Sequence, residues 1–356
     1  MKETGSPRRF RSIPTGETAA AEFPDSNRGK NEMKHILVAG GAGYIGSACT
    51  EYLLDRGYAV TVFDALITGH RDAVDPRAEF VEGNLADRDL IVGLCREKHF
   101  DGIMHFAAFS LVGESMKDPA KYFRNNLCNA INLADAAVAG KVPHFVFSST
   151  AATFGEPEKT PIDESAPQKP INPYGESKLC FEKVLRWYSE IYGLTYTALR
   201  YFNAAGATPL HGEDHRPESH LIPLILQTVR GKRDKLMLYG DDYPTPDGSC
   251  IRDYIHILDL AQAHELALAA PRSGCYNLGT SNGLSVLEII AAAERVTGKK
   301  VNYEVAPRRA GDPPRLIADS RLARRELGWA PRFENADDII SSAWEWQLKF
   351  PEGYRR

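Results

Sequence analysis

Several signatures of other protein classes are absent from this sequence of 356 residues. It has no Gly-x-x-x-x-Gly-Lys-Ser/Thr segment, so a P-loop nucleotide site is excluded. No apolar run approaches the roughly 20 residues that a membrane-spanning helix requires. The formal net charge is −4, which gives no indication of nucleic acid as a partner. With 43% hydrophobic and 25% charged residues, the composition is typical of a globular protein.

Cysteine is sparse and scattered. The six cysteines include no Cys-x-x-Cys pair and no cluster with histidine. This pattern is typical of free thiols in a reducing compartment, so we expect a cytoplasmic protein.

Residues 1–32 lack apolar periodicity and mix arginines with acidic residues. A secretory signal would have an apolar core, and a transit peptide would be poor in acids. We interpret residues 1–33 as a disordered tail, with a misassigned start and Met33 as the true initiator as the alternative.

Three glycines, Gly40, Gly43 and Gly46, follow the first apolar run at residues 34–39, and a helical pattern continues from there. Bare backbone at a helix N-terminus lets a pyrophosphate approach the main-chain amides. The spacing differs from the Gly-x-Gly-x-x-Gly fingerprint, and a tight turn between strand and helix would also explain these glycines.

Asp64 strengthens the case for dinucleotide binding. It follows the next apolar run, residues 59–63, and lies 18 residues beyond Gly46. A carboxylate there can accept hydrogen bonds from both ribose hydroxyls of an adenosine, and it would repel a 2′-phosphate. The sequence therefore predicts NAD rather than NADP as the cofactor.

Apolar runs alternate with helical patterns through the first half of the chain. Strands are expected at residues 79–81, 102–106 and 144–147, and helices at 87–97 and 119–139. This alternation predicts an α/β fold with a Rossmann-type, doubly wound parallel sheet. Beyond Asn203 the alternation fails. We expect an NAD-binding domain at 34–205 and a smaller α/β substrate domain at 206–356, with some segments crossing between them.

Tyr174 and Lys178 stand four residues apart in a segment with a helical pattern. On a helix they share one face, with Cβ atoms about 5–6 Å apart. A neighbouring ammonium group would lower the pKa of the Tyr174 phenol and make it a usable acid/base. Thr150, at the end of the fifth expected strand, can hydrogen-bond a substrate alcohol, although such hydroxyls also cap turns. We expect Thr150 and Tyr174 to form a proton-handling pair.

The segments GGAGYIGS, HFAAFSLVGES, SSTAATFG and YGESK, together with Asp64, resemble the extended short-chain dehydrogenase/reductase family. In the second half, RYFNAAGATP, LYGDDYPTPDGSCIRDYIHILDLAQAH and RRAGDPPRLIADS are similar to the nucleotide-sugar 4-epimerases of that family. The resemblance runs from about residue 34 to the end of the chain.

This resemblance implies reversible epimerisation of UDP-glucose and UDP-galactose at C4. Tyr174 would take the proton of the 4′-hydroxyl while hydride leaves C4′ for NAD, and Thr150 would bond the same oxygen. Lys178 would bind the nicotinamide ribose and lower the pKa of Tyr174. The transient 4-keto sugar would turn over and regain the hydride on its other face, so NAD would stay bound.

The resemblance also implies which residues hold NAD. Asn84 and Ser110 depart from the aspartate and lysine of some relatives, so main-chain amides would carry more of the phosphate binding. The implied cofactor positions are Gly40, Gly43, Tyr44, Ile45, Gly46, Asp64, Ala65, Leu66, Thr68, Gly69, Asn84, Leu85, Phe106, Ala107, Ala108, Ser110, Asn125, Ser148, Tyr174, Lys178 and Phe202.

A UDP-sugar is the implied substrate. Arginine forks match phosphate oxygens, so Arg252 and Arg309 would bind the pyrophosphate, with surface salt bridges as the alternative explanation. Leu316 would bear on whether an N-acetyl group fits. The implied substrate positions are Thr150, Tyr174, Asn203, His220, Leu221, Tyr239, Arg252, Arg309, Asp312 and Leu316.

Other activities were weighed against the same residues. A dehydratase would carry Asp-Glu after Thr150, where Ala151 and Ala152 stand. Epimerases of N-acetylhexosamine, pentose or uronate sugars stay open as alternatives. A non-catalytic dinucleotide sensor would typically lose Tyr174 or Lys178. For His211 and His215 we expect solvated side chains and no metal site, because further ligands are not evident from the sequence. A homodimer through the helices near 119–139 and 173–192 is implied by the resemblance alone.

Overall fold

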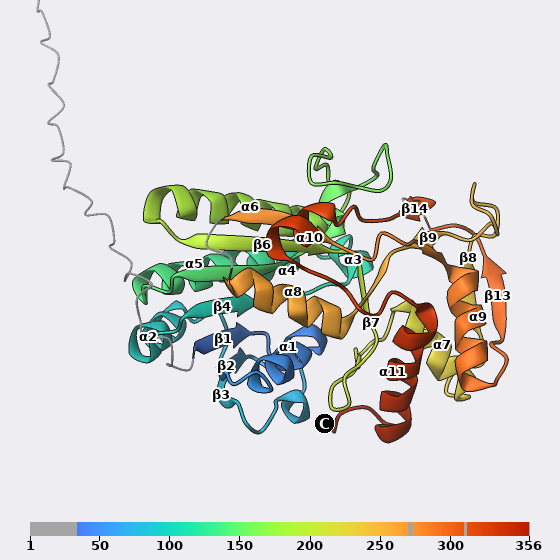
Figure 1. Cartoon of the computed structure of the whole chain (residues 1–356), viewed down its shortest axis with the longest axis horizontal. Helices are drawn as coiled ribbons and strands as arrows, with labels where there is room; N and C mark the ends of the chain where they lie inside the picture. Colours follow the sequence, from blue (N-terminus) through green and yellow to red (C-terminus); the bar gives the residue numbers. More distant parts are fainter. Residues whose placement is uncertain (1–33, 270–272, 310–311, 356) are drawn as a thin grey trace, which may run out of the picture.

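The computed structural model describes residues 34–269, 273–309 and 312–355 (Figure 1). The interpretation of residues 1–33 as a disordered tail lies outside this range. No helix of the described part is long and apolar enough to cross a bilayer.

A seven-stranded sheet forms the middle layer, with the strand order β11-β6-β5-β4-β1-β2-β3. Every neighbouring pair in it is parallel. Its strands are β1 (His35–Ala39), β2 (Ala59–Asp64), β3 (Glu79–Glu82), β4 (Gly102–His105), β5 (His144–Thr150), β6 (Thr195–Tyr201) and β11 (Gly274–Leu278). The chain order reverses between β1 and β4, which creates the crevice where such folds bind ligands. The predicted Rossmann-type sheet is confirmed.

Helices cover both faces of this sheet. Along β1, Ile36 and Val38 belong to one buried cluster and Leu37 and Ala39 to another, because successive side chains point to opposite faces. The first face packs against α1 (Tyr44–Leu54) and α8 (Ile257–Ala269), and the second against α2 (Arg88–Lys98), α5 (Asn129–Ala139) and α6 (Pro173–Tyr192).

Three helices of the second half enclose a separate core, on the right in Figure 1. They are α7 (Leu221–Val229), α9 (Val286–Thr297) and α11 (Ala336–Lys349). Short strands accompany them in three small sheets: β7 (Asn203–Ala205) with β10 (Tyr254–His256), β8 (Leu236–Tyr239) with β13 (Tyr303–Ala306), and β9 (Ile251–Arg252) with β12 (Leu284–Ser285) and β14 (Arg315–Leu316).

Some elements of the second half return to the large sheet. β11 forms its edge next to β6, and α8 packs on α1. α10 (Arg321–Leu327) then packs against β11 and α8. The chain therefore leaves the large sheet after β6, comes back with α8 and β11, and returns once more with α10.

The expected regular helix at residues 119–139 is interrupted. The structure has α4 (Pro119–Tyr122), a π-helical turn η2 (Phe123–Cys128) and then α5. Asn126, inside η2, is buried, and its side-chain amide bonds both the N–H and the C=O of Phe109 at 2.9 Å. The widened turn thus places a polar side chain where it fixes the loop after β4. The remaining short helices are η1 (Arg71–Ala73), α3 (Val112–Ser115) and η3 (Ala151–Phe154).

Candidate active site

The glycine turn lies between β1 and α1, at the point where the strand order reverses. Gly40 has φ +85°, and a Cβ atom there would lie 2.4 Å from the Ala107 nitrogen. At Gly46 a Cβ would lie 2.2 Å from the Gly40 carbonyl oxygen. Both positions therefore require glycine for packing. At Gly43 a Cβ would meet only the Gly40 oxygen, at 3.4 Å, so the space before the N-terminus of α1 is left for a ligand.

Asp64 ends β2 and faces this turn. Its carboxylate accepts hydrogen bonds from the Ala42 N–H at 3.0 Å and the Leu66 N–H at 2.8 Å. Burial raises the pKa of Asp64, and the main-chain hydrogen bonds oppose that rise. A carboxylate has about four lone-pair sites, so the Asp64 side chain can still accept from hydroxyl groups.

The other expected cofactor positions gather at the carboxyl ends of neighbouring strands, as the fold class requires. Ala65, Leu66, Thr68 and Gly69 follow β2, Asn84 and Leu85 follow β3, Phe106, Ala107, Ala108 and Ser110 follow β4, Ser148 lies near the end of β5, and Phe202 follows β6.

Some of these side chains have partners inside the protein. The Asn84 side chain accepts from the Ala86 N–H at 2.9 Å, and Ser110 is exposed. Asn125 lies in η2, and its side-chain amide donates to the Asn126 side chain at 3.1 Å. Asn126 in turn holds the loop after β4. The Tyr44 hydroxyl donates to the Gly206 carbonyl oxygen at 2.6 Å.

Tyr174 and Lys178 lie in the first two turns of α6. The helix begins here because the Asn172 side chain caps the Gly175 N–H at 2.8 Å and Pro173 occupies the first position. The Thr150 side chain at the end of β5 lies beside the Tyr174 phenol and lowers its pKa. Lys178 Nζ donates to the Ser148 carbonyl oxygen at 2.9 Å. The helix and the strand end thus bring the three expected catalytic residues together.

The expected effect of Lys178 on the pKa of Tyr174 is not found. Burial raises the pKa of Tyr174, and the Thr150 hydrogen bond offsets only part of this rise. Burial also lowers the pKa of Lys178 to about 7, with the Glu182 carboxylate opposing. The expectation that the pKa of Tyr174 is depressed is therefore wrong, since desolvation by burial outweighs the lowering effect of Thr150.

A buried ion pair lies one helical turn beyond Lys178, and it was not predicted from the sequence. Glu182, one turn further along α6, binds Arg200 of β6 through two hydrogen bonds of 2.6 and 3.0 Å. Both side chains are only 5% exposed. Ser149 Oγ also donates to Glu182, at 2.5 Å. The four-residue spacing of Tyr174, Lys178 and Glu182 was the available signal, because it places all three on one helix face.

Two pairs of side chains form the expected substrate side. Arg252 of β9 is buried and pairs with Asp312, and it stands opposite Leu316 in the β9–β14 register. Arg309 is exposed, and its guanidinium lies 4.0 Å from the centre of the Tyr239 ring. Arg252 thus forms a salt bridge, as the alternative explanation expects, but a largely buried one, because its side chain is only 10% exposed.

Asp253, next to Arg252, holds this region together and was not anticipated. Its buried carboxylate accepts from the Thr280 N–H and hydroxyl, both at 2.8 Å, and from the N–H groups of Ser281 and Ala318. Its carbonyl oxygen accepts from the Asn203 side chain at 3.0 Å. Asp253 therefore fixes Asn203 and Arg252 relative to one another.

The histidines of the loop before α7 are not solvated as expected. His211 is buried, and its Nδ1 lies 2.7 Å from a Glu51 oxygen. His215 packs beside two glutamates. His220 is the N-cap of α7 and Leu221 its first residue, so both expected substrate positions lie at the start of that helix.

A cofactor crevice of this kind, with a tyrosine and lysine at its edge, defines an NAD-dependent short-chain dehydrogenase/reductase. The chain belongs to the NAD dependent epimerase/dehydratase family, whose model matches residues 36–279. The family confirms the predicted cofactor.

Individual relatives are similar over nearly the whole described chain. The UDP-glucose 4-epimerase of Lacticaseibacillus casei is 53% identical over 325 residues, covering 90% of this chain and 98% of the relative. The crystal structure of UDP-glucose 4-epimerase from Brucella ovis in complex with NAD matches with a TM-score of 0.85 and 46% identity, covering 87% and 97% of the two chains. The Bifidobacterium longum enzyme in complex with NAD+ and UDP matches with a TM-score of 0.85 and 36% identity, covering 90% and 100%.

Proposed function

We propose that this protein interconverts UDP-glucose and UDP-galactose by inverting C4 of the sugar. The observation that carries the proposal is that the Thr150 side chain and the Tyr174 phenol lie beside one another at the carboxyl end of β5, on the same sheet edge as the glycine turn. A hydroxyl bound there can lose or regain a proton beside a nicotinamide. The 53% identity to the Lacticaseibacillus casei enzyme supports the choice of substrate.

NAD would lie along the carboxyl ends of β1 to β5. The N-terminus of α1 would bind the pyrophosphate and Asp64 the adenosine ribose. NAD bound there would supply a hydride acceptor for C4 of the sugar and, once reduced, a hydride donor for the keto form. Residues 34–205 would form the cofactor domain and 206–356 the substrate domain, with the elements that return to the sheet as exceptions.

Tyr174 would handle the proton of the 4′-hydroxyl. As a buried phenol with a raised pKa, Tyr174 is protonated near neutral pH, so a proton is present beside the keto oxygen. To act as a base it needs a nearby positive charge, and Lys178 can supply one because its pKa of about 7 lets it be charged or neutral near neutral pH. Thr150 would hold the same sugar oxygen in place. The Ser148 carbonyl keeps Lys178 at this position.

The second half would hold the nucleotide while the sugar turns. Arg252 can bind phosphate oxygens through the guanidinium edge that now meets Asp312, and Arg309 would add a second cation. Asn203 would bond a phosphate, and Tyr239 would stack near the uracil. His220 and Leu221 at the start of α7 and Leu316 opposite Arg252 would complete the pocket.

We also propose a homodimer in the cytoplasm. Three large apolar side chains of α6 are exposed: Trp187 at 52%, Ile191 at 63% and Tyr192 at 44%. An apolar group of this kind on one helix suits a second copy of the chain. All six cysteines are unpaired, which suits a reducing compartment. Light scattering at micromolar concentration should give twice the mass of one chain, and a monomer would contradict the dimer.

The function is tested by incubating the purified protein with UDP-galactose and no added NAD. Formation of UDP-glucose on copurified cofactor is the expected result. Parallel reactions with UDP-N-acetylglucosamine, a UDP-pentose and a UDP-uronate test the alternative sugars. If the protein contains NAD but converts only one of these alternative sugars, that sugar becomes the proposed substrate. If it contains NAD and converts none of the sugars, the result contradicts an epimerase.

A further inference from the structure

Four metal-ligating side chains converge in the loop between β7 and α7. They are Glu213, His215, Glu218 and His220, and one ligand atom from each lies within 4.8 Å of all the others. The loop is well away from Tyr174 in the chain, and the reaction proposed above uses only His220 of the four. The cluster therefore requires an explanation of its own.

Three separations within the cluster are close to those of a coordination sphere, and the His215 Nδ1 to Glu218 Oε2 distance is longer, at 3.8 Å. His220 Nδ1 lies 2.9 Å from Glu213 Oε1 and 3.0 Å from Glu218 Oε1. His215 Nδ1 lies 3.2 Å from the same Glu213 oxygen. Ligands of a tetrahedral zinc ion, each at about 2.0 Å from the metal, are about 3.3 Å from one another. An ion could thus be bound with small side-chain movements.

His215 shows that direct hydrogen bonding does not fully satisfy the cluster. Its Nδ1 atom is buried and close to Glu213, yet it has no hydrogen bond of acceptable geometry among the described residues. A buried ring nitrogen without such a bond is costly, and metal coordination would satisfy it.

The charge of the cluster also needs a partner. The side chains of Glu213 and Glu218 are only 9% and 8% exposed, and two close carboxylates need about two positive charges. Among the described residues no lysine or arginine forms an ion pair with them. The nearby Arg216 pairs with Asp214 instead.

Two protonated imidazoles or one divalent cation could supply this charge. With protonated imidazoles the metal-free cluster would be a pair of ion pairs. A divalent cation provides the same charge and also coordinates the His215 nitrogen.

We propose that Glu213, His215, Glu218 and His220 bind one divalent transition-metal ion, with Zn2+ as the best fit. Two imidazole nitrogens and two carboxylate oxygens are ligands that zinc accepts in a closed, four-coordinate site. Ca2+ and Mg2+ fit less well, because they prefer oxygen ligands only.

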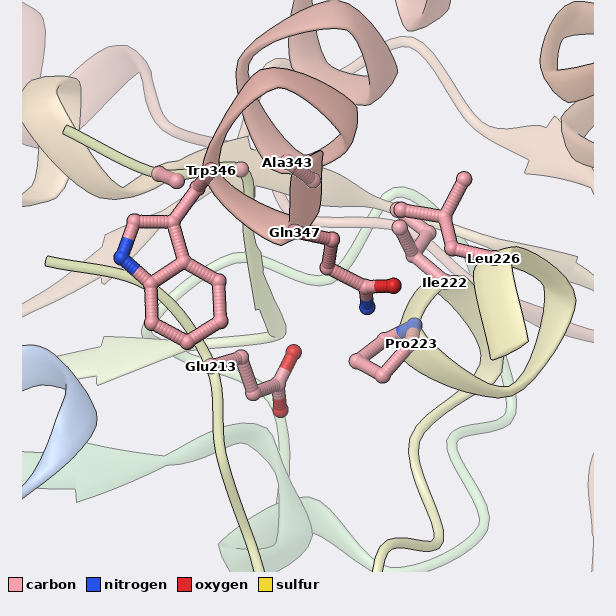
Figure 2. Close-up of a pocket in the computed structure, with 9 residues that line it drawn as sticks. Glu213, Ile222, Pro223, Leu226, Ala343, Trp346 and Gln347 are labelled. Carbon is pink, nitrogen blue, oxygen red and sulfur yellow. The ribbon is translucent and has the colours of Figure 1, made fainter. Parts of the chain in front are cut away.

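The position of the cluster indicates a structural role. The Tyr44 ring, from the start of α1, packs edge-on against His215 with ring centres 6.2 Å apart. His220 leads directly into α7. Glu213 also borders a cavity of about 10 Å³ between α7 and α11, with room for about one water, and points into it together with Gln347 (Figure 2). A metal here would join the cofactor turn to the first helix of the substrate side.

The test begins with the full chain, dialysed against metal-free buffer and analysed by mass spectrometry for bound metals. We expect about one zinc ion per chain, or, in protein stripped with a chelator, one tight site in a Zn2+ titration against a chromophoric competitor. Co2+ in the same site should give the intense visible bands of a tetrahedral complex.

Variants assign the ligands. His215→Gln and Glu218→Gln should each weaken Zn2+ binding by about 100-fold or more, since losing a residue that only supports a ligand already costs about 10–100-fold. His99→Gln, which removes an exposed histidine after α2, should bind as the wild type does. Retained NAD content in each variant shows that the fold is intact.

The proposal is overturned if the chelator-treated protein binds Zn2+ no more tightly than either cluster variant. It is also overturned if His99→Gln loses the metal equally, or if Ca2+ or Mg2+ displaces Zn2+. Metal content and Co2+ spectra do not depend on the substrate, so failure here is distinguishable from failure of the proposed epimerase activity.

Discussion

Lys178 Nζ donates a hydrogen bond of 2.9 Å to the main-chain carbonyl oxygen of Ser148. The bond joins α6 to the end of β5 and holds the lysine where it is only 3% exposed. An amine in this position loses much of the hydration that favours its charged form. The stability of the protein and the chemistry of the site both depend on this loss of hydration at Lys178.

The first prediction concerns stability and pH. The pKa of Lys178 is about 7 in the folded protein, against 10.5 for an ordinary lysine. Between these pH values the unfolded chain binds more protons at this position than the folded protein does. The free energy of unfolding therefore increases as the pH rises from about 7 to 10.5. Urea unfolding across this range should show a shallower rise for Lys178→Met. A difference between the two proteins that does not vary with pH would contradict this prediction.

The second prediction concerns the proton-handling phenol. Tyr174→Phe removes the hydroxyl that lies beside Thr150, so turnover of UDP-galactose should fall by roughly 10²–10⁴-fold. Bound NAD should stay at the wild-type level. Tyr188→Phe is the matched control, because it lies on the same helix and its hydroxyl bonds Asp135 instead. Equal turnover in the two variants would remove Tyr174 from the mechanism.

The third prediction compares two glutamates of α6. Glu182→Met leaves the buried Arg200 without its partner and should lower the free energy of unfolding by about 3–5 kcal/mol. Glu190→Met breaks only an exposed pair with Arg186 and should change it by less than about 0.5 kcal/mol. Urea unfolding of both variants measures the difference, and similar losses would count against a stabilising buried pair.

The fourth prediction concerns the nucleotide. Arg252→Met should weaken UDP binding by roughly 10–100-fold, since a hydrogen bond to a charged group contributes about 1.5–3 kcal/mol. Arg308→Met is the control, because Arg308 is exposed and pairs with Asp242. Isothermal titration with UDP on NAD-loaded protein separates the two variants. Unchanged affinity in Arg252→Met would place the pyrophosphate elsewhere.

The fifth prediction concerns the cofactor turn. Gly46→Ala would place a Cβ 2.2 Å from the Gly40 carbonyl oxygen, so the turn must shift and NAD content should fall. Gly93→Ala is the control, because a Cβ there meets nothing within 4 Å inside α2. That variant should keep its NAD and gain about 0.5–1 kcal/mol in stability. Full NAD content in Gly46→Ala would show that the turn tolerates a side chain.

The fold and the convergence of Thr150, Tyr174 and Lys178 could be predicted because they follow from local patterns. Strand–helix alternation determines the sheet, and residues at the carboxyl ends of parallel strands meet at one edge. The cofactor was predictable from Asp64 for the same reason. Each of these inferences depends only on local sequence patterns.

What the sequence did not reveal depends on burial and on distant partners. The pKa of Tyr174 rises because its surroundings are desolvated, which no four-residue spacing can indicate. Arg200 reaches Glu182 only after β6 is laid beside β5. The glutamates beside His215 and the widened turn at Asn126 likewise acquire their roles from tertiary contacts.

The repeated return of the chain to the large sheet has a mechanical consequence. Connections run between the sheet and the second half after β6, before α8, after β11 and on both sides of α10. A single hinge cannot open such an arrangement, because all of these connections would have to bend together. These backbone connections would therefore confine a bound keto intermediate, with no need for a separate lid to retain it.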